Sequence, residues 1–399
     1  MTKKSDTPAI RFKGFTDTWE QRKLGELVDR VVRKNINNES TLPLTISAQY
    51  GLVDQITYFN NRVASRDVSN YYLVLNGEFA YNKSTSDGYP FGAVKRLDLY
   101  EKGVLSTLYI VFAPKKEQQI DSDYLTVFFD TDRWHKGVAE RAAEGARNHG
   151  LLNISAEDFF DIDLSVPKDI VEQKQIGAFI RQLDNLITLH QRKYDKLTNV
   201  KKSMLEKMFP KNGSNVPEIR FKGFTEAWEQ RKLGDVVKEI TRNDPESEAP
   251  IMMITANNGF IEQSERYAFN NAGESLKKYI LLKKGELAYN HGASKLRPYG
   301  SCFALTTAEN ARIPFVYHCF SAENQNAEFM SIELNGAEIE NQLRKIVSSG
   351  ARMDGLLNIS FDEYTSVSVL LPGTEEQDCI ADFFRQLDNL ITLHQREPT

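Results

Sequence analysis

The sequence contains few cysteines and no long apolar stretch. Only Cys302, Cys319 and Cys379 occur among its 399 residues, an odd number confined to the second half. We therefore expect neither a disulfide framework nor a zinc site built from several cysteines, and we expect a reducing compartment. No segment approaches the roughly 18 apolar residues of a membrane helix. Residues 1–8 carry lysines without the apolar region of a secretory signal, so we expect a cytoplasmic protein with no membrane partner.

The sequence also lacks an excess of positive charge. It has 50 Lys and Arg residues against 55 Asp and Glu residues, a net charge of −5. A protein that coats nucleic acid without specificity usually has a basic excess, so this class is not favoured. A protein that binds a specific nucleic-acid sequence is compatible with this net charge, because a local basic surface or a basic partner can supply the phosphate contacts.

The motifs of common enzyme classes are missing as well. Neither the G-x-G-x-x-G dinucleotide fingerprint nor the G-x-x-x-x-G-K-[ST] phosphate loop occurs. G-x-S-x-G, H-E-x-x-H and the Asp/Asn-Pro-Pro-aromatic tetrapeptide of amino-group DNA methyltransferases are also absent. His149, His291 and His318 have no Cys or His at the spacing of metal ligands. We expect no catalytic residue, no bound metal and no cofactor in this chain.

What the sequence does contain is an internal duplication. Residues 10–28 return at 219–237 with 15 of 19 positions identical, and 182–192 return at 386–396 with all 11 identical. Two further blocks, 71–82 and 145–155, return at 279–290 and 350–360. The order is the same and the offset drifts only from 209 to 204. This period is far longer than a solenoid repeat, so the chain consists of two complete domains.

The two copies are alike at their ends and different in their middles. Residues 31–69 and 239–275 have diverged almost completely, although polar positions at the ends are identical. This distribution suggests one scaffold that presents two different surfaces. Uneven drift after a recent duplication is the alternative.

Each copy has the pattern of a compact mixed α/β domain. Short runs rich in β-branched and aromatic residues predict strands at 42–46, 71–75, 78–81 and 105–112, with a tight turn at Asn76-Gly77. Residues 124–129 and 133–144 read as helices. Short strands mixed with helices indicate an α/β (mixed α+β) domain.

A long amphipathic helix is predicted between the copies. Apolar residues recur at steps of mostly three and four from 176 to 208, which is typical of a coiled-coil seam. A helix over 170–208 would span about 58 Å, with Pro167 before it and Pro210 and Gly213 after it. It would join the domains; packing on its own domain is the alternative. The second copy starts near Glu375, and the printed sequence ends before a counterpart of 193–208.

These patterns divide the chain into five parts. We expect an N-terminal segment (1–17), a first domain (18–167), a central spacer helix (168–211), a second domain (212–372) and a shortened C-terminal spacer helix (373–399).

The repeated blocks resemble the DNA-specificity subunit of type I restriction–modification enzymes. The family pattern R-F-x-G-F-x-x-x-W-x-x-[RK]-K-L-G, then L-L-N-I-S, then E-Q-x-x-I entering a long helix occurs twice. It covers residues 11–25, 151–155 and 172–187, and again 220–234, 356–360 and 376–391. The resemblance extends over essentially the whole chain, and the shortened C-terminal helix is its departure from the family.

The resemblance implies two target-recognition domains joined by two long antiparallel helices with pseudo-two-fold symmetry. Each domain would read one half of an asymmetric bipartite site in double-stranded DNA. The helices would set the spacing and dock two modification subunits, which carry S-adenosylmethionine and methylate adenine N6. Restriction subunits, with ATP and Mg, would translocate and cleave. The chain itself would be a non-catalytic specificity subunit. A protein-interaction scaffold with two modules and no DNA role is the alternative function.

Candidate DNA-binding residues lie where the two copies have identical flanking residues but different residues beside or between them. Asn, Lys and Arg donate well to base edges and phosphates; ordinary solvated turn chemistry is the alternative for each loop. The candidates are Asn82, Lys83, Ser84, Thr85, Ser86, Arg147, Asn148, His149, Asn290, His291, Ser294, Lys295, Arg352 and Met353. Tyr81, Tyr289, Trp19 and Trp228 are expected in the core instead.

Candidate partner-binding residues lie on the two helices. The identical segments 182–192 and 386–396 predict two equivalent docking sites, with Leu183, Ile187, Leu387 and Ile391 on them. Aspartate at Leu183 and Ile187 is expected to bury charge in the seam and abolish folding or assembly. Residues 192–211 have seven basic and two acidic side chains, a local net of +5, and would face partner acids, DNA phosphates or only solvent.

Overall fold

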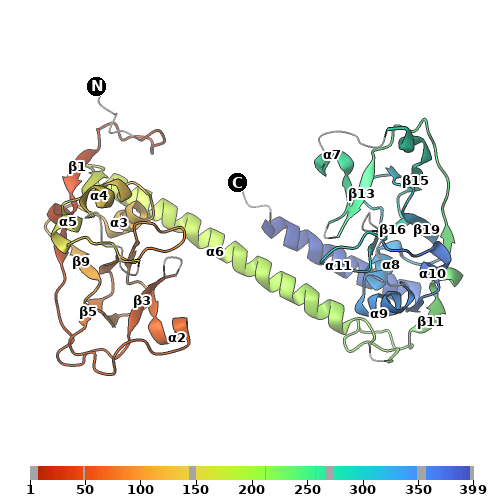
Figure 1. Cartoon of the computed structure of the whole chain (residues 1–399), viewed down its shortest axis with the longest axis horizontal. Helices are drawn as coiled ribbons and strands as arrows, with labels where there is room; N and C mark the ends of the chain where they lie inside the picture. The colour runs from red at the N-terminus through yellow and green to blue at the C-terminus, as the bar shows by residue number, and fades with distance from the viewer. Residues whose placement is uncertain are drawn as a thin grey trace. The chain divides into compact units, whose positions relative to one another are not determined.

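The structure is a computed structural model that describes residues 8–47, 50–142, 150–211, 213–256, 258–266, 273–347 and 356–395. It contains two compact units, residues 1–189 and 190–399, each a mixed α/β domain (Figure 1). The division falls inside α6 (Ile170–Lys207), the helix that joins them. The helix expected over 170–208 is therefore present.

Unit 1 is built from short strands and helices. Its first half contains β1 (Glu20–Lys23), α1 (Leu24–Leu27), β2 (Val28–Arg30), β3 (Leu44–Ser47), β4 (Gly51–Asp54), α2 (Gln55–Phe59), β5 (Tyr72–Leu75) and β6 (Phe79–Asn82). Its second half contains β7 (Ala93–Arg96), β8 (Lys102–Leu105), β9 (Ile110–Pro114), α3 (Ser122–Phe129), α4 (His135–Arg141), α5 (Ala156–Phe160) and β10 (Asp163–Val166). A four-stranded sheet has the order β2-β9-β6-β7, and β1–β10, β3–β4 and β5–β8 form separate pairs.

Unit 2 repeats this architecture. Its strands are β11 (Glu229–Lys232), β12 (Val237–Glu239), β13 (Met252–Thr255), β14 (Gly259–Glu262), β15 (Ile280–Lys283), β16 (Leu287–Asn290), β17 (Ser301–Ala304), β18 (Asn310–Ile313), β19 (His318–Ala322) and β20 (Ser368–Leu371). Its helices are η1 (Leu233–Asp235), α7 (Gln263–Arg266), η2 (Gly273–Lys278), α8 (Ala327–Leu334), α9 (Ala337–Ile346), α10 (Phe361–Thr365) and α11 (Thr374–Gln395). The sheet order β12-β19-β16-β17 matches that of unit 1 strand for strand.

One predicted strand is wrong in its extent. Residues 105–112 are not continuous: Leu105 ends β8, a turn closed by a 3.2 Å hydrogen bond from Tyr109 N to Ser106 O follows, and Ile110 starts β9. The two strands then enter different sheets. An uninterrupted run of β-forming residues did not reveal this turn, because it contains neither Gly nor Pro.

The aromatic residues expected in the core are there. Tyr81 and Tyr289 are buried on equivalent strands and stack on Phe159 and Tyr364, with ring centroids 4.3 and 3.9 Å apart. Trp228 is buried too, while Trp19 is half-buried against the core of unit 1. Such rings contribute packing rather than stacking on bases.

The repeated ends of each copy are tied together by a buried ion pair. Arg11 donates from Nε and one terminal nitrogen to the Glu172 carboxylate at 2.6 and 2.8 Å. Arg220 makes the same two-pronged contact with Glu376, both bonds 2.7 Å long. Glu172 and Glu376 are almost fully buried near the starts of α6 and α11. The Ile-Arg-Phe and Glu-Gln motifs thus supply the two partners of one ion pair.

The glutamine of each Glu-Gln motif completes this junction. Gln173 accepts a hydrogen bond from Asp121 N and donates to Pro167 O. Gln377 accepts from Asn326 N and donates to Pro372 O. Both side chains therefore form hydrogen bonds with backbone groups between the last strand of a domain and the long helix that follows it. These bonds are a structural reason for the identical residues at the ends of the two copies.

The prediction of a packed coiled-coil seam is wrong over the middle of α6. Residues 181–189 are all exposed; Leu183 is 39% and Ile187 is 58% exposed. Farther along, the helix does pair with α11 within unit 2: His190 Nδ1 lies 3.1 Å from His394 Nδ1, and Lys201 contacts Asp388. The rising and falling residue numbers show that these helix segments run antiparallel.

Candidate nucleic-acid interface

In unit 1, the loop after β6 lies against the Leu-Leu-Asn-Ile-Ser segment. Ser84 pairs with Leu151 in an antiparallel bridge, and Leu152 N donates to Lys83 O at 3.0 Å. Thr85 donates from both its backbone nitrogen and its hydroxyl to Gly150 O, at 2.7 and 3.0 Å. The structure thus brings the candidate loop against a repeated motif that follows the second group of candidates, residues 147–149, in the chain.

Unit 2 has the same arrangement with different residues. Gly292 pairs with Leu356, and Leu357 N donates to His291 O at 2.9 Å. The two units therefore share an arrangement of backbone hydrogen bonds, which we call the loop frame. The side chains on this frame differ between the units. This is the geometry expected of one scaffold with two surfaces.

A glycine follows the loop in each unit because the chain passes very close to the end of β6 or β16. Gly92 (φ +76°) and Gly300 (φ +81°) both have left-handed backbones. A Cβ atom at Gly92 would lie 2.1 Å from Asn82 O, and one at Gly300 would lie 2.6 Å from Asn290 O. Only glycine meets both requirements, so the loop's return path is fixed.

The last residue of the Leu-Leu-Asn-Ile-Ser segment caps a helix in both units. Ser155 Oγ accepts from Asp158 N at the start of α5. Ser360 Oγ accepts from Glu363 N at the start of α10, and the Glu363 carboxylate accepts from Ser360 N in return. The segment is therefore held by a loop at one end and by a helix N-terminus at the other.

The candidate DNA-binding residues differ in accessibility. Ser84, Ser86, Ser294 and Lys295 are exposed. The half-buried ones are Asn82, Lys83, Thr85 and Asn290. Arg147, Asn148, His149, Arg352 and Met353 lie outside the described residues. The exposed candidates therefore form the accessible part of this surface.

The structure does not place the His291 side chain on the accessible surface, although the sequence made it a candidate for DNA contact. Its side chain is buried, with Nδ1 2.8 Å from Leu357 O and Nε2 2.7 Å from Val316 O. The ring also stacks on His318 at a centroid distance of 5.2 Å. Since both ring nitrogens are engaged inside the domain, neither is available to a base edge. The sequence did not reveal this, because both partners are distant in the chain.

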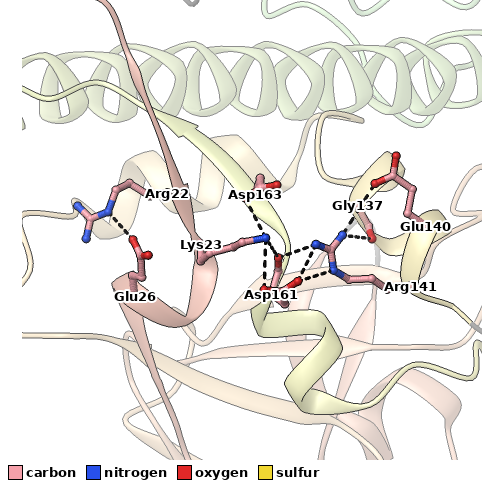
Figure 2. A network of polar contacts seen from close by, with 8 residues as sticks. All are labelled: Arg22, Lys23, Glu26, Gly137, Glu140, Arg141, Asp161 and Asp163. Carbon is pink, nitrogen blue, oxygen red and sulfur yellow. Dashed lines mark hydrogen bonds and ion pairs between the residues drawn. The ribbon is translucent and has the colours of Figure 1, made fainter.

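In unit 1, a second network fixes the helix that precedes residues 143–149. Arg141, at the end of α4, donates to the Asp161 carboxylate at 2.7 Å and to Asp161 O at 2.9 Å (Figure 2). Lys23 of β1 approaches the same carboxylate and that of Asp163, at 3.3 and 3.2 Å. These contacts, above all the hydrogen bond from Arg141, hold the pKa of Asp161 below its usual value. The end of α4 is thereby attached to β1 and β10.

The described residues contain no group of three or more His, Cys, Asp or Glu side chains arranged to hold a metal ion. Cys302 and Cys319 are buried free thiols, and Cys379 is exposed. Burial raises the pKa of Cys302 to about 12. Within the same described part of the chain, no helix is long and apolar enough to cross a membrane.

A cleft of about 1100 Å³ lies within unit 2, between the end of α6 and helices α8 and α11. Glu333 on α8 is buried at its wall and accepts a hydrogen bond from Leu370 N. Burial without a cationic partner raises the pKa of Glu333 to about 7. The sequence did not point to this residue, because its partner is a distant backbone group.

We expect Glu333→Gln to stabilise unit 2 above pH 7. Between pH 4.5 and 7 the folded state keeps a proton that the unfolded state has lost, so stability falls as pH rises through this window. Glutamine removes this dependence and still accepts from Leu370 N. The gain is about 3 kcal/mol at most at pH 8 and close to zero at pH 4. Thermal unfolding at both pH values measures it, with exposed Glu323→Gln as the control; equal gains at both pH values would contradict the assignment.

Comparison with known proteins finds related sequences. Residues 16–199 match the family model of the type I restriction modification DNA specificity domain. The specificity subunit of type I restriction enzyme MjaVIII from Methanocaldococcus jannaschii is 24% identical over 372 residues, covering 85% of this chain and 80% of that protein. This chain is therefore similar to type I specificity subunits, through a matching domain model in its first half and a relative that aligns along most of its length. The matched residues cover unit 1 from residue 16 onward, and unit 2 repeats its motifs and sheet order.

One solved structure shows a similar fold. The S subunit of a type I restriction–modification system from M. genitalium superposes with a TM-score of 0.53 at 12% identity, covering 98% of this chain and 94% of that one. The HsdS subunit from Thermoanaerobacter tengcongensis gives a TM-score of 0.40 at 16% identity, covering 95% and 91%.

Proposed function

We propose that this chain is the DNA-reading, non-catalytic subunit of a type I restriction–modification complex. Each unit would read one half of an asymmetric bipartite site in double-stranded DNA. The chain would direct adenine N6 methylation, or ATP-dependent cleavage, by partner subunits. S-adenosylmethionine, ATP and Mg would be bound by those partners and not by this chain.

This proposal depends on one observation: the two units hold equivalent loops by the same backbone contacts, and the side chains on those loops differ. In both units the same backbone contacts hold the segment after β6 or β16 against Leu-Leu-Asn-Ile-Ser. The exposed candidate side chains on these loops are Ser84 and Ser86 in one unit and Ser294 and Lys295 in the other. Hydroxyl and amine groups donate to base edges and phosphates, and a difference between the frames is what two unlike half-sites require.

Docking of modification subunits is supported by the exposed part of α6. Phe179, Leu183, Leu186, Ile187 and Leu189 are 39–58% exposed on consecutive turns of this helix. Grouped exposed apolar side chains of this kind mark protein interaction sites. The two sites are not equivalent in this structure, however, because Leu387 is 6% exposed and Ile391 half-buried where Leu183 and Ile187 are exposed. Leu387 would therefore act through packing rather than direct contact.

The proposal is tested by co-purifying the chain with the modification subunit encoded beside it. The complex is expected to methylate genomic DNA at a bipartite sequence and to bind a duplex carrying it, whereas the chain alone methylates nothing. Binding that is indifferent to both half-sequences would instead favour an interaction scaffold with no reading role.

We expect Leu183→Asp with Ile187→Asp to leave the chain folded and to weaken docking. Both side chains are exposed, so aspartate does not bury a charge in the chain itself. Where a partner covers them, each buried carboxylate would cost several kcal/mol. Circular dichroism and the mass of the assembled complex measure the two effects. Lys174→Asp, an exposed site nearer the helix start, is the control; an unfolded double variant would show that these leucine and isoleucine side chains pack within the chain.

A further inference from the structure

A short hairpin in each unit ends in a turn of the same construction. In unit 1 the turn joins β3 to β4, and Ser47 Oγ accepts a hydrogen bond from Tyr50 N at 3.1 Å. In unit 2 the turn joins β13 to β14, and Thr255 Oγ1 accepts from Asn258 N at 3.2 Å. The strands of the two hairpins pair in the same register, and a glycine begins the second strand of each. Tyr50 and Asn258 therefore occupy equivalent positions.

These hairpins lie in the middles of the two copies, where the sequences have diverged almost completely. The residues that build the turn are nevertheless alike: a hydroxyl side chain on the first strand, and a glycine with a left-handed backbone (φ +80° and +64°) on the second. The residue before the glycine differs, and in both units it is exposed: Tyr50 is 63% exposed, and Asn258 is exposed too. The turn therefore repeats what the loop frame shows, one backbone with two different side chains.

In unit 2 the turn lies beside the loop frame. Asn290, the last residue of β16 before the loop, donates from Nδ2 to Ile254 O of β13 at 3.2 Å and accepts from Gly292 N at 2.9 Å. One side chain thus bonds to both the hairpin and the loop. On the other strand, a Cβ atom at Gly259 would lie 3.2 Å from Phe303 Cδ1 of β17, the strand to which the loop returns.

In unit 1 the hairpin lies in the same place. Ile46 of β3 and Leu52 of β4, a cross-strand pair near the turn, share a hydrophobic cluster with Ala93 of β7. Ala93 in turn pairs with Asn82, the last residue of β6 before the loop. Contacts between β4 and β7 hold the hairpin there. In each unit, therefore, the turn and the loop lie at the same end of the β6–β7 or β16–β17 pair.

The chemistry of the turn suits base edges rather than phosphates. Residues 44–53 and 252–261 contain no charged side chain. The amide of Asn258 can donate and accept together, which is how asparagine pairs with N6 and N7 of adenine. The hydroxyl of Tyr50 can donate or accept one bond at a time. Such neutral groups contribute little to the electrostatic attraction of DNA, but they distinguish one base pair from another.

We infer that Tyr50 and Asn258 are specificity-determining residues, each of which contacts a base edge in the half-site read by its own unit. The inference rests on the proposed function and adds a second element, the hairpin turn, to the reading surface of each unit. Asn258 selects an A·T pair in the second half-site, and Tyr50 contacts one base pair in the first. Because neither side chain is charged, their loss changes sequence preference and leaves the salt dependence of binding unchanged.

The test uses the complex of the chain with its modification subunit, and duplexes in which each base pair of the methylated sequence found for that complex is replaced in turn. Asn258→Ala is expected to weaken binding to the cognate duplex by roughly 5- to 150-fold, the range for one bidentate contact. The four base pairs should then bind almost equally at one position of the second half-site. Tyr50→Ala should act in the same way on the first half-site, with a smaller loss. Asn310→Ala, which removes an exposed amide elsewhere in unit 2, is the control.

A second variant separates reading from stability. Tyr50→Asn gives unit 1 the side chain that unit 2 has in the equivalent turn. In cells that contain the complex, the methylated sequence is expected to change at one position of the first half and nowhere else. An unfolded unit would abolish methylation at the site instead of changing one base of it.

Wild-type base preference at every position in both alanine variants would overturn the inference. An equal loss on every duplex would also overturn it, because a contact that ignores sequence produces that result. Loss of the modification subunit from the complex would show that the turn docks a protein, again contrary to the inference. A wild-type complex that does not distinguish its methylated sequence from altered duplexes would instead overturn the proposed function.

Discussion

Glu376→Ala is expected to destabilise unit 2 by about 3–5 kcal/mol, the range for removing one partner of a buried ion pair. The carboxylate is 1% exposed and accepts two hydrogen bonds of 2.7 Å from Arg220. Its loss leaves the Arg220 guanidinium without its carboxylate partner near the start of α11. For a unit of this size the melting temperature should fall by roughly 10 °C. Differential scanning calorimetry measures the shift.

The ion pair has matched controls in the chain. Glu375→Ala removes an exposed carboxylate one residue earlier and should change the melting temperature by little. Glu376→Ala combined with Arg220→Met should recover part of the loss, because no unpaired cation is left. A melting temperature for Glu376→Ala equal to that of Glu375→Ala would contradict the structural role given to this contact. Glu172→Ala in unit 1 should behave in the same way.

The organisation of the chain was largely predictable from its repeats. Two copies of one pattern gave two domains of like topology, and the period of apolar residues gave a helix that the structure has at Ile170–Lys207. These features depend on local sequence and on comparison of the chain with itself. The ion pair joining Arg11 to Glu172 was not predicted, although both residues lie in quoted motifs, because it spans 161 positions.

Burial was less predictable than secondary structure. Leu183 and Leu387 occupy the same position in identical segments, yet one is 39% and the other 6% exposed. What packs on a helix is decided by distant parts of the chain, so no local pattern distinguishes them. His291 is a second example, within the candidate site. This polar residue of a variable loop is buried, and two carbonyl oxygens from distant parts of the chain lie against its ring nitrogens.

The candidate surface was predicted in outline only. Comparison of the copies selected residues in the loop after β6 or β16 and residues 147–149 and 352–353, which lie outside the described residues. The structure shows the loop hydrogen-bonded to the neighbouring Leu-Leu-Asn-Ile-Ser segment in each unit. It also shows that their backbone groups make the frame, while side chains such as Ser86 and Lys295 are the accessible ones. Which side chains face outward depends on the hydrogen bonds of the folded loop.

The central claim is that the two units read separate half-sites, and an exchange of one unit tests it most directly. Residues 17–167 would be replaced by the corresponding region of a relative with a different specificity, leaving α6 and unit 2 unchanged. The hybrid chain would be produced with its modification subunit in cells, and the methylated sequences would be determined across the genome. The account predicts that one half of the bipartite sequence changes completely while the other half stays the same. A change in both halves together would contradict it, because the duplicated units would then form one joint reading surface.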